Sequence, residues 1–150
     1  MNLNFIKNND IRECLAPIGN ASSTDSNTDI IDTSGYEGVT FITPITDCDD
    51  TGVATMTIEQ STANADTAMA ALSGATATAT SASNNDLNDT LLIVEVDHPQ
   101  ERYIQAVLTS ATANIAFGTT IVILHGPKKM PISEDDSVQD STLVVGPAEA

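Results

Sequence analysis

The side chains that most often carry out catalysis are few in this chain and stand apart in the sequence. The histidines are His98 and His125, and the cysteines are Cys14 and Cys48. No serine lies in a G-x-S-x-G sequence, and neither cysteine has a neighbour that the sequence marks as its catalytic partner. Glycine-rich nucleotide-binding motifs are absent too. The sequence therefore predicts a non-enzymatic protein with no catalytic residue and no cofactor.

Two acidic turns, residues 47–52 (DCDDTG) and residues 84–89 (NNDLND), raise the question of a calcium site. Calcium binds several carboxylate and carbonyl oxygens, but the D-x-D-x-D-G spacing of a calcium loop is missing. Solvated turns are the favoured interpretation. Cys14 and Cys48 lack the spacing of zinc ligands, so we expect reduced thiols and no metal site.

Cations are rare, and three of the five lie close to predicted strand ends, at Arg102, Lys128 and Lys129. Arg102 also stands beside Tyr103. One interpretation is surface charge that keeps strand ends soluble. The other is a basic spot that binds an acidic neighbour, which makes these four residues candidate partner-binding positions.

Length and charge restrict the class of protein. A chain of 150 residues predicts one domain, and its net charge of −16 disfavours direct binding to nucleic acid or to an anionic membrane. No apolar run is long enough for a membrane span, so we expect synthesis and folding in the cytoplasm. Because aromatic residues make up only 3% of the chain, the core must be thin or shared between copies. A homodimer or homotrimer is the expected state.

The elements that must position these residues are strands. Residues 91–127 hold the densest run of β-branched and aromatic residues, and their period of two predicts strands at 91–97, 103–109, 115–117 and 119–125. The first two are expected to form a hairpin. Earlier strands are predicted at 39–45, at an edge because of Pro44, at 53–59 and at 75–83. Residues 61–72 fit either short helical turns or a loop. The predicted core includes Ile104, Leu108, Ile121 and Ile123.

The two ends of the chain lack any regular period. We expect an extended N-terminal arm over residues 1–34, a sandwich domain over 35–131 and a flexible acidic tail over 132–150. The arm and tail are expected to become ordered only on a partner. Their candidate contact residues are those with apolar surface to bury, namely Phe5, Ile6, Ile11, Leu15, Leu143, Val144 and Val145.

The order of short motifs in residues 36–131 resembles a group of small phage virion proteins of the capsid decoration or cement type. The motifs are VEVDHPQ, ERYIQAVLTSATANIAFG and IVILHGPKKMP, with matching positions at Arg102, Tyr103, Thr109, 111–114, Gly126, Pro127, Lys128, Lys129 and Pro131. The resemblance implies an all-β antiparallel sandwich of the jelly-roll type. It also implies a structural protein on the capsid surface of the virion that binds the major capsid protein and stabilises the head.

Two other functions stay open on the sequence. A tail- or fibre-associated adhesion module that binds host glycans is the first alternative. The second is a polysaccharide-degrading enzyme, because a chain with 21 acidic residues can conceal a pair of catalytic carboxylates. The scarcity of aromatic platforms for sugars speaks against both.

Overall fold

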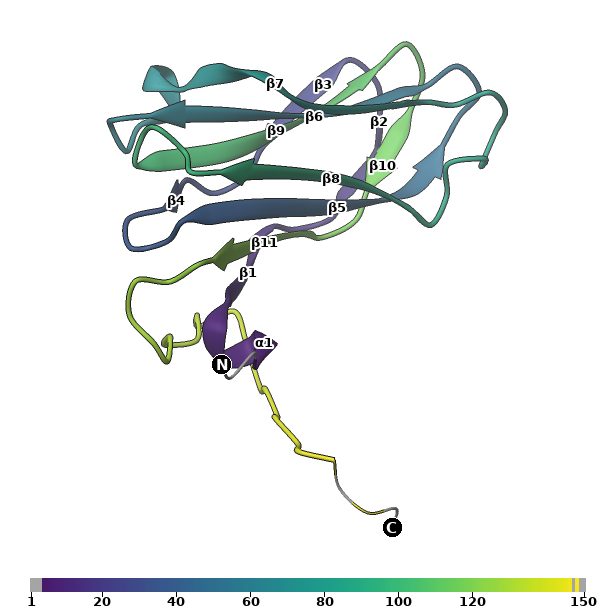
Figure 1. Ribbon diagram of the computed structural model, residues 1–150. Helices are drawn as coiled ribbons and strands as arrows, with labels where there is room; N and C mark the ends of the chain where they lie inside the picture. Colours follow the sequence, from purple (N-terminus) through teal and green to yellow (C-terminus); the bar gives the residue numbers. More distant parts are fainter. Residues whose placement is uncertain (1–3, 147, 149–150) are drawn as a thin grey trace.

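The computed structural model describes residues 4–146 and 148, and it consists of two antiparallel sheets packed face to face (Figure 1). Sheet A contains β1 (Asp10–Leu15), β11 (Thr120–His125), β5 (Gly38–Cys48) and β8 (Thr90–Asp97), with the short strands β10 (Ile115–Phe117) and β2 (Ile18–Ala21). Sheet B contains β3 (Thr24–Asn27), β4 (Ile31–Asp32), β9 (Tyr103–Ala111), β6 (Val53–Ser61) and β7 (Ala70–Thr80). A helical turn, α1 (Phe5–Asn8), precedes β1, and a 3-10 helix, η1 (Asp66–Ala68), precedes β7.

The strand order is that of a jelly roll. In sheet A the neighbours run β1, β11, β5, β8, and in sheet B they run β3 with β4, then β9, β6 and β7. If β1 with β2, β3 with β4, and β10 with β11 are each counted as one interrupted strand, four strands face four, and the connections alternate between sheets except at the β6–β7 hairpin. This is the double Greek-key arrangement of jelly rolls. The predicted fold class is confirmed.

The core lies between the sheets and is filled by every second residue of the long strands. In β6 the inward residues Ala54, Met56 and Ile58 are fully buried, while Thr55 and Thr57 between them face outward. In β8 the predicted alternation is also confirmed, because Leu92 and Val94 are buried and Leu91 and Ile93 are exposed. Apolar burial of this kind is the main stabilising contribution to folding.

The predicted pairing of residues 91–97 with 103–109 is wrong. β8 pairs with β5 in sheet A, whereas β9 pairs with β6, β3 and β4 in sheet B. The connection at residues 98–102 therefore crosses from one sheet to the other. A period of two identifies the inward face of each strand, but it cannot tell which sheet the strand joins.

The edge position predicted from Pro44 is wrong as well. β5 is central, with β8 on one side and β11 and β10 on the other. Pro44 lies where β11 gives way to β10, between the Ile42–Ile121 and Ile45–Phe117 pairs, and its carbonyl accepts a hydrogen bond from Gly118 N at 2.8 Å. A proline without an N–H is tolerated at such an irregularity of the ladder.

The predicted inward face of β11 is the opposite of the observed one. Val122 and Leu124 are fully buried, whereas Ile121 is 39% exposed and Ile123 is half-buried on the outer face. All four side chains are apolar, so their hydrophobicity does not distinguish the two faces. The predictions for Ile104 and Leu108 are confirmed, because both lie in the core.

The predicted N-terminal arm is largely part of the sandwich, which corrects the expectation that it becomes ordered only on a partner. β1 pairs with β11, β2 with β10, and β3 and β4 with β9, and Cys14 and Ile31 are buried in the core. Strands such as β3 (TDSN) are too polar to show an apolar period, yet their backbones complete the ladders of both sheets. The expectation was wrong because it considered only the apolar period of the side chains and not the hydrogen bonds of the backbone.

The acidic tail has no strand in its described part, but residues 132–141 run along the open edge of β1. Ile132 N donates to Lys7 O at 3.3 Å, and Glu13 N donates to Ser137 Oγ at 3.1 Å. Over residues 142–146 the chain extends away from the sandwich (Figure 1). The tail thus has a docked half and an exposed half.

Candidate functional site

The outer face of sheet A carries a continuous apolar surface. Cross-strand pairs place Ile93, Ile42 and Ile121 side by side on β8, β5 and β11. Leu91 lies beside this row opposite Pro44, and Ile123 lies on its other side opposite Ile11 of β1. Exposed fractions are 57% for Leu91, 52% for Ile93 and 39% for Ile121. We call this surface the apolar face: Ile11, Ile42, Leu91, Ile93, Ile121 and Ile123.

Two strands of the apolar face have the sequence pattern of strands that are buried on both sides. β8 begins TLLIV and β11 reads TIVIL, so apolar side chains point both into the core and away from it. Strands with uninterrupted apolar runs are typical of sheets covered on both faces. In the described chain nothing covers the outer side of β8. The apolar face therefore has the composition of an interface, and its signal was present in the sequence as these uninterrupted runs.

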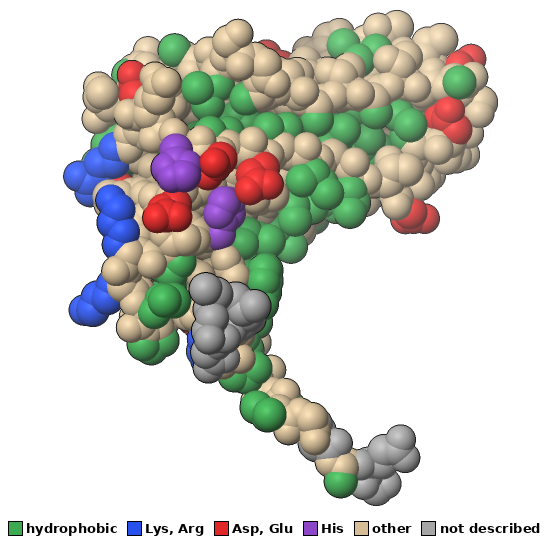
Figure 2. All heavy atoms as spheres, viewed as in Figure 1, with side chains coloured by type: hydrophobic (Ala, Val, Ile, Leu, Met, Phe, Trp, Pro, Cys, Tyr) green, Lys and Arg blue, Asp and Glu red, His purple; other side chains and the backbone are tan. Residues whose placement is uncertain are grey.

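Charged and polar side chains limit the apolar face at one end. His125 on β11 lies with its Nε2 3.2 Å from Glu95 Oε1 of β8, across Gly38 of β5. In the loop that follows β8, His98 Nδ1 lies 2.8 Å from Asp97 Oδ1. Figure 2 shows the two histidines among carboxylates at this end of the molecule. A polar rim around an apolar centre is the usual anatomy of a protein interface.

Arg102 and Tyr103, both predicted partner-binding residues, are largely occupied by contacts within the chain. Arg102 Nε and Nη2 donate to the two carboxylate oxygens of Asp32 at 2.9 and 2.7 Å, and the guanidinium lies 5.2 Å from the centre of the Tyr103 ring. The hydrogen bonds from Arg102 hold the pKa of Asp32 well below its usual range. Arg102 therefore ties β4 to the start of β9.

Lys128 and Lys129, also predicted to contact a partner, are exposed and make no ion pair with the described residues. Lys128 and Arg102 line the same open pocket of about 460 Å³, between the loops at residues 33–37 and 98–102. Figure 2 shows Lys and Arg side chains together at this end of the sandwich. The structure brings these three cations to one end of the molecule, away from the centre of the apolar face.

The apolar residues predicted at the two ends do not form one site. Phe5 on α1 is 55% exposed, and Leu15 packs against the core from β1. Ile6 and Ile11 line a small pocket that Val138 of the docked tail closes. Leu143, Val144 and Val145 are 42%, 58% and 89% exposed on the extended half of the tail. Only Ile11 connects this group to the apolar face.

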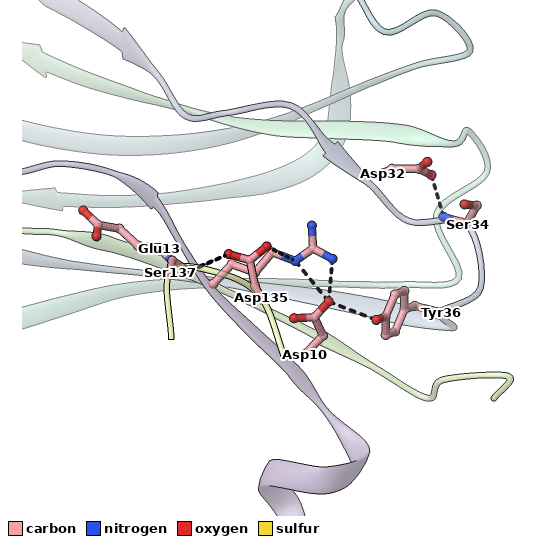
Figure 3. A network of polar contacts seen from close by, with 8 residues as sticks. Asp10, Glu13, Asp32, Ser34, Tyr36, Asp135 and Ser137 are labelled. Carbon is pink, nitrogen blue, oxygen red and sulfur yellow. Dashed lines mark hydrogen bonds and ion pairs between the residues drawn. The ribbon is translucent and has the colours of Figure 1, made fainter. Parts of the chain in front are cut away.

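A polar network fastens the tail to β1 (Figure 3). Asp10 is 1% exposed, and its Oδ2 accepts hydrogen bonds from Arg12 Nε and from the Tyr36 hydroxyl, each at 3.0 Å. Arg12 Nε also lies 3.5 Å from Asp135 Oδ2 of the tail. The hydrogen bond to Asp10 raises the pKa of Arg12, so the guanidinium stays charged. The network joins β1, the loop before β5 and the tail, and all its members have structural contacts.

The remaining candidate groups for chemistry have structural roles as well. Cys14 and Cys48 are free and buried, and burial raises the pKa of the Cys14 thiol to about 12, which makes it unreactive. In the two acidic turns, Asn114 Nδ2 donates to Asp49 at 2.8 Å and Ser81 Oγ donates to Asp86 at 2.8 Å. Among the residues that the structure describes, no group of His, Cys, Asp or Glu has the geometry of a metal site.

Comparison of the chain with protein-family models, with curated proteins and with solved structures finds no match. Within the described part of the chain, no helix is long and apolar enough to cross a membrane.

Proposed function

We propose that this chain is a structural subunit of a phage virion, a capsid cement or decoration protein that binds the major capsid protein shell through the apolar face. The observation that carries the proposal is an apolar sheet surface without a cover, with three large side chains between 39% and 57% exposed. Exposed apolar patches with a polar rim mark protein interaction surfaces. The motif resemblance in residues 36–131 supports the choice of a phage shell as the partner.

The net charge supports the outside of the shell as the location. A charge of −16 repels the phosphates of packaged DNA and keeps the free subunit soluble before assembly. A subunit that binds only the assembled shell stabilises it by mass action, by about 2.7 kcal/mol per site when its free concentration is 100 times its Kd. Cementing of this kind requires no catalytic residue.

The exposed fractions on the apolar face indicate how much free energy each side chain can contribute to binding. Burying a side chain such as Ile completely contributes about 1.5–3 kcal/mol, so Leu91, Ile93 and Ile121, each about half exposed, contribute about 1 kcal/mol apiece. Such a contact is modest for a single copy. Binding becomes strong when several linked copies engage neighbouring sites of a lattice.

Co-sedimentation of the purified chain with purified shells of the virus that encodes it tests the proposal. Ile93→Asp and Ile121→Asp each place a charge in the apolar face and should abolish co-sedimentation while the fold, followed by circular dichroism, is kept. Met130→Asp is the matched control, because Met130 is 61% exposed and lies outside the apolar face. Shell binding by both face variants at the level of the wild type would show that another surface docks. Failure of the wild type to bind shells would refute the proposed function.

The open pocket between residues 33–37 and 98–102 favours a second candidate, an adhesion module that binds host glycans. Its lining includes Tyr36, Gln100, Glu101 and Arg102, which supply hydrogen-bonding groups of the kind that bind sugar hydroxyls. Screening the chain against a glycan array, with Gln100→Ala as the variant, separates this candidate from the first. Glycan binding that Gln100→Ala removes, together with no binding to shells, would favour adhesion.

A further inference from the structure

In the part of the chain that the structure describes, the sandwich has four sheet edges: β1 continued by β2, β3 continued by β4, β7 and β8. All but β7 are protected against pairing with another chain. β2 is only four residues long, and very short edge strands offer little backbone to pair with. Residues 132–141 of the tail lie along β1, where Ser137 Oγ accepts a hydrogen bond from Glu13 N. The edges formed by β3, β4 and β8 carry carboxylates: Asp25, Asp32, Glu95 and Asp97. Covering segments and charged side chains are the usual means by which proteins prevent edge strands from pairing with other molecules.

The fourth edge, β7, has none of these protections. Its 11 residues, AALSGATATAT, include no charged residue and no proline, and in the described chain it pairs only with β6. An edge strand has unpaired backbone N–H and C=O groups along its outer side. Thr76, Thr78 and Thr80 are exposed on the outer face of sheet B, while Ala75, Ala77 and Ala79 pack against the core from the other face.

The second half of β7 has the regular geometry that pairing requires. An irregularity at residues 72–75 interrupts the ladder with β6, but residues 76–80 pair in register with residues 53–57 of β6. The alternation of inward and outward side chains is unbroken over residues 75–80. On this stretch Thr78 Oγ1 lies 3.3 Å from Thr55 Oγ1, and Thr76 Oγ1 lies 3.3 Å from Thr57 Oγ1. The threonines therefore already form cross-strand pairs with β6. On the other side of β7, within the plane of the sheet, they have no neighbouring strand in the described chain.

We propose that two copies of the chain pair through β7, antiparallel and about a two-fold axis at Ala77, so that sheet B continues from one subunit into the other. In this register Thr76 lies opposite the partner's Thr78, and Ala75 lies opposite the partner's Ala79. Threonine thus meets threonine on the outer face and alanine meets alanine on the inner face, which keeps every side chain on its own side of the sheet. A two-fold interface uses the same strand of both copies.

The alternation of Ala and Thr explains why a second copy suits this edge. Small side chains leave no steric obstacle to a neighbouring strand, and a segment without charge does not repel its own copy. The rest of the molecule does repel its own copy, since each chain carries a net charge of −16. The dimer is therefore expected to be concentration-dependent and to strengthen when salt screens that repulsion.

Sedimentation velocity on the free full-length chain tests the pairing without any shell, so its failure is distinct from failure of the proposed function. The double variants T76D/T78D and T76K/T78K each place like charges opposite one another and should raise the dimer Kd at least tenfold. An equimolar mixture of the two should form a heterodimer, because acids then face lysines. A variant that has merely lost its fold cannot be rescued in this way. A wild-type chain that stays monomeric in about 0.5 M salt at high concentration, or a mixture that stays monomeric, would overturn the proposal.

Disulfide trapping tests the register. The native cysteines, Cys14 and Cys48, are buried, so introduced cysteines at the edge are the accessible ones. Directly opposite residues of an antiparallel pair have Cα atoms about 4.5–5.5 Å apart, which a disulfide can bridge. A mixture of T76C and T78C should cross-link to the heterodimer, and T78C alone should not. Cross-linking of T78C with itself would place the axis at residue 78 and contradict the proposed register.

Discussion

Single residues decide how the apolar face ends. A Cβ at Gly38 would lie 2.1 Å from Cε1 of His125, so the imidazole occupies the space above β5 that a side chain at position 38 would take. From there it extends toward Glu95 of β8. The glycine is therefore needed for close approach of a neighbouring side chain, and the amino-acid sequence alone gives no sign of this role.

Gly38→Ala should destabilise the chain by about 1–3 kcal/mol, the usual cost of overpacking, because the ring of His125 must move. The double variant G38A/H125A should recover most of that loss, since the obstructing ring is gone. Chemical denaturation of the wild type, the two single variants and the double variant measures the coupling. If the double variant loses the sum of the two single losses, the contact between residues 38 and 125 is not the cause.

Elements of the fold differ in how firmly they are held. The core strands pair along their whole length, whereas the tail depends on a few side chains. Hydrogen bonds from Ser141 and Lys7 lower the pKa of Glu134, and hydrogen bonds from Ser137 lower the pKa of Asp135, with a smaller contribution from the charge of Arg12. The ion pairs of Glu134 with Lys7 and of Asp135 with Arg12 join the tail to the rest of the molecule, and both require an ionised carboxylate.

Acidification should release the tail before the sandwich unfolds. Because the pKa values of Glu134 and Asp135 are lower in the docked state, their contribution is fully present above the ordinary carboxyl pKa of about 4 and is lost as pH falls through the depressed values. NMR signals of residues 132–141 should become those of a flexible chain below about pH 4, while the signals of β5 and β6 stay dispersed. Asp135→Ala should weaken docking already at neutral pH. Release at the same pH as global unfolding would contradict the prediction.

For the whole molecule, charge and apolar exposure act in opposite directions. The chain has 21 acidic and five basic residues, yet it exposes Leu91, Ile93 and Ile121 on one face of the sandwich. Repulsion between copies keeps such a surface from associating without specificity, and a complementary partner overcomes that repulsion. The molecule thus combines solubility as a free subunit with a defined surface for assembly.

Salt should stabilise the fold itself. Self-repulsion at a charge of −16 favours the expanded, unfolded chain, and raising NaCl from about 10 mM to about 1 M shortens the screening length from about 30 Å to about 3 Å. The Tm should therefore rise by several degrees over this range. Calorimetry at low protein concentration, where the chain is monomeric, measures the effect without a contribution from dimerisation. A constant or falling Tm would show that native ion pairs such as Arg102–Asp32 outweigh the repulsion.

The sequence by itself determined the strands and their inward faces wherever apolar and polar residues alternate, as at Met56 and Ile58 of β6. The tertiary structure alone decided what alternation does not encode: which sheet β8 and β9 join, the central place of β5, and the outward side of Ile121 and Ile123. It also decided the role of polar strands such as β3, which are held by backbone hydrogen bonds that any sequence can make. Side-chain periodicity is local, whereas sheet membership depends on pairing between residues far apart in the chain, and for that reason the apolar face and the free edge of β7 could be located only in the folded molecule.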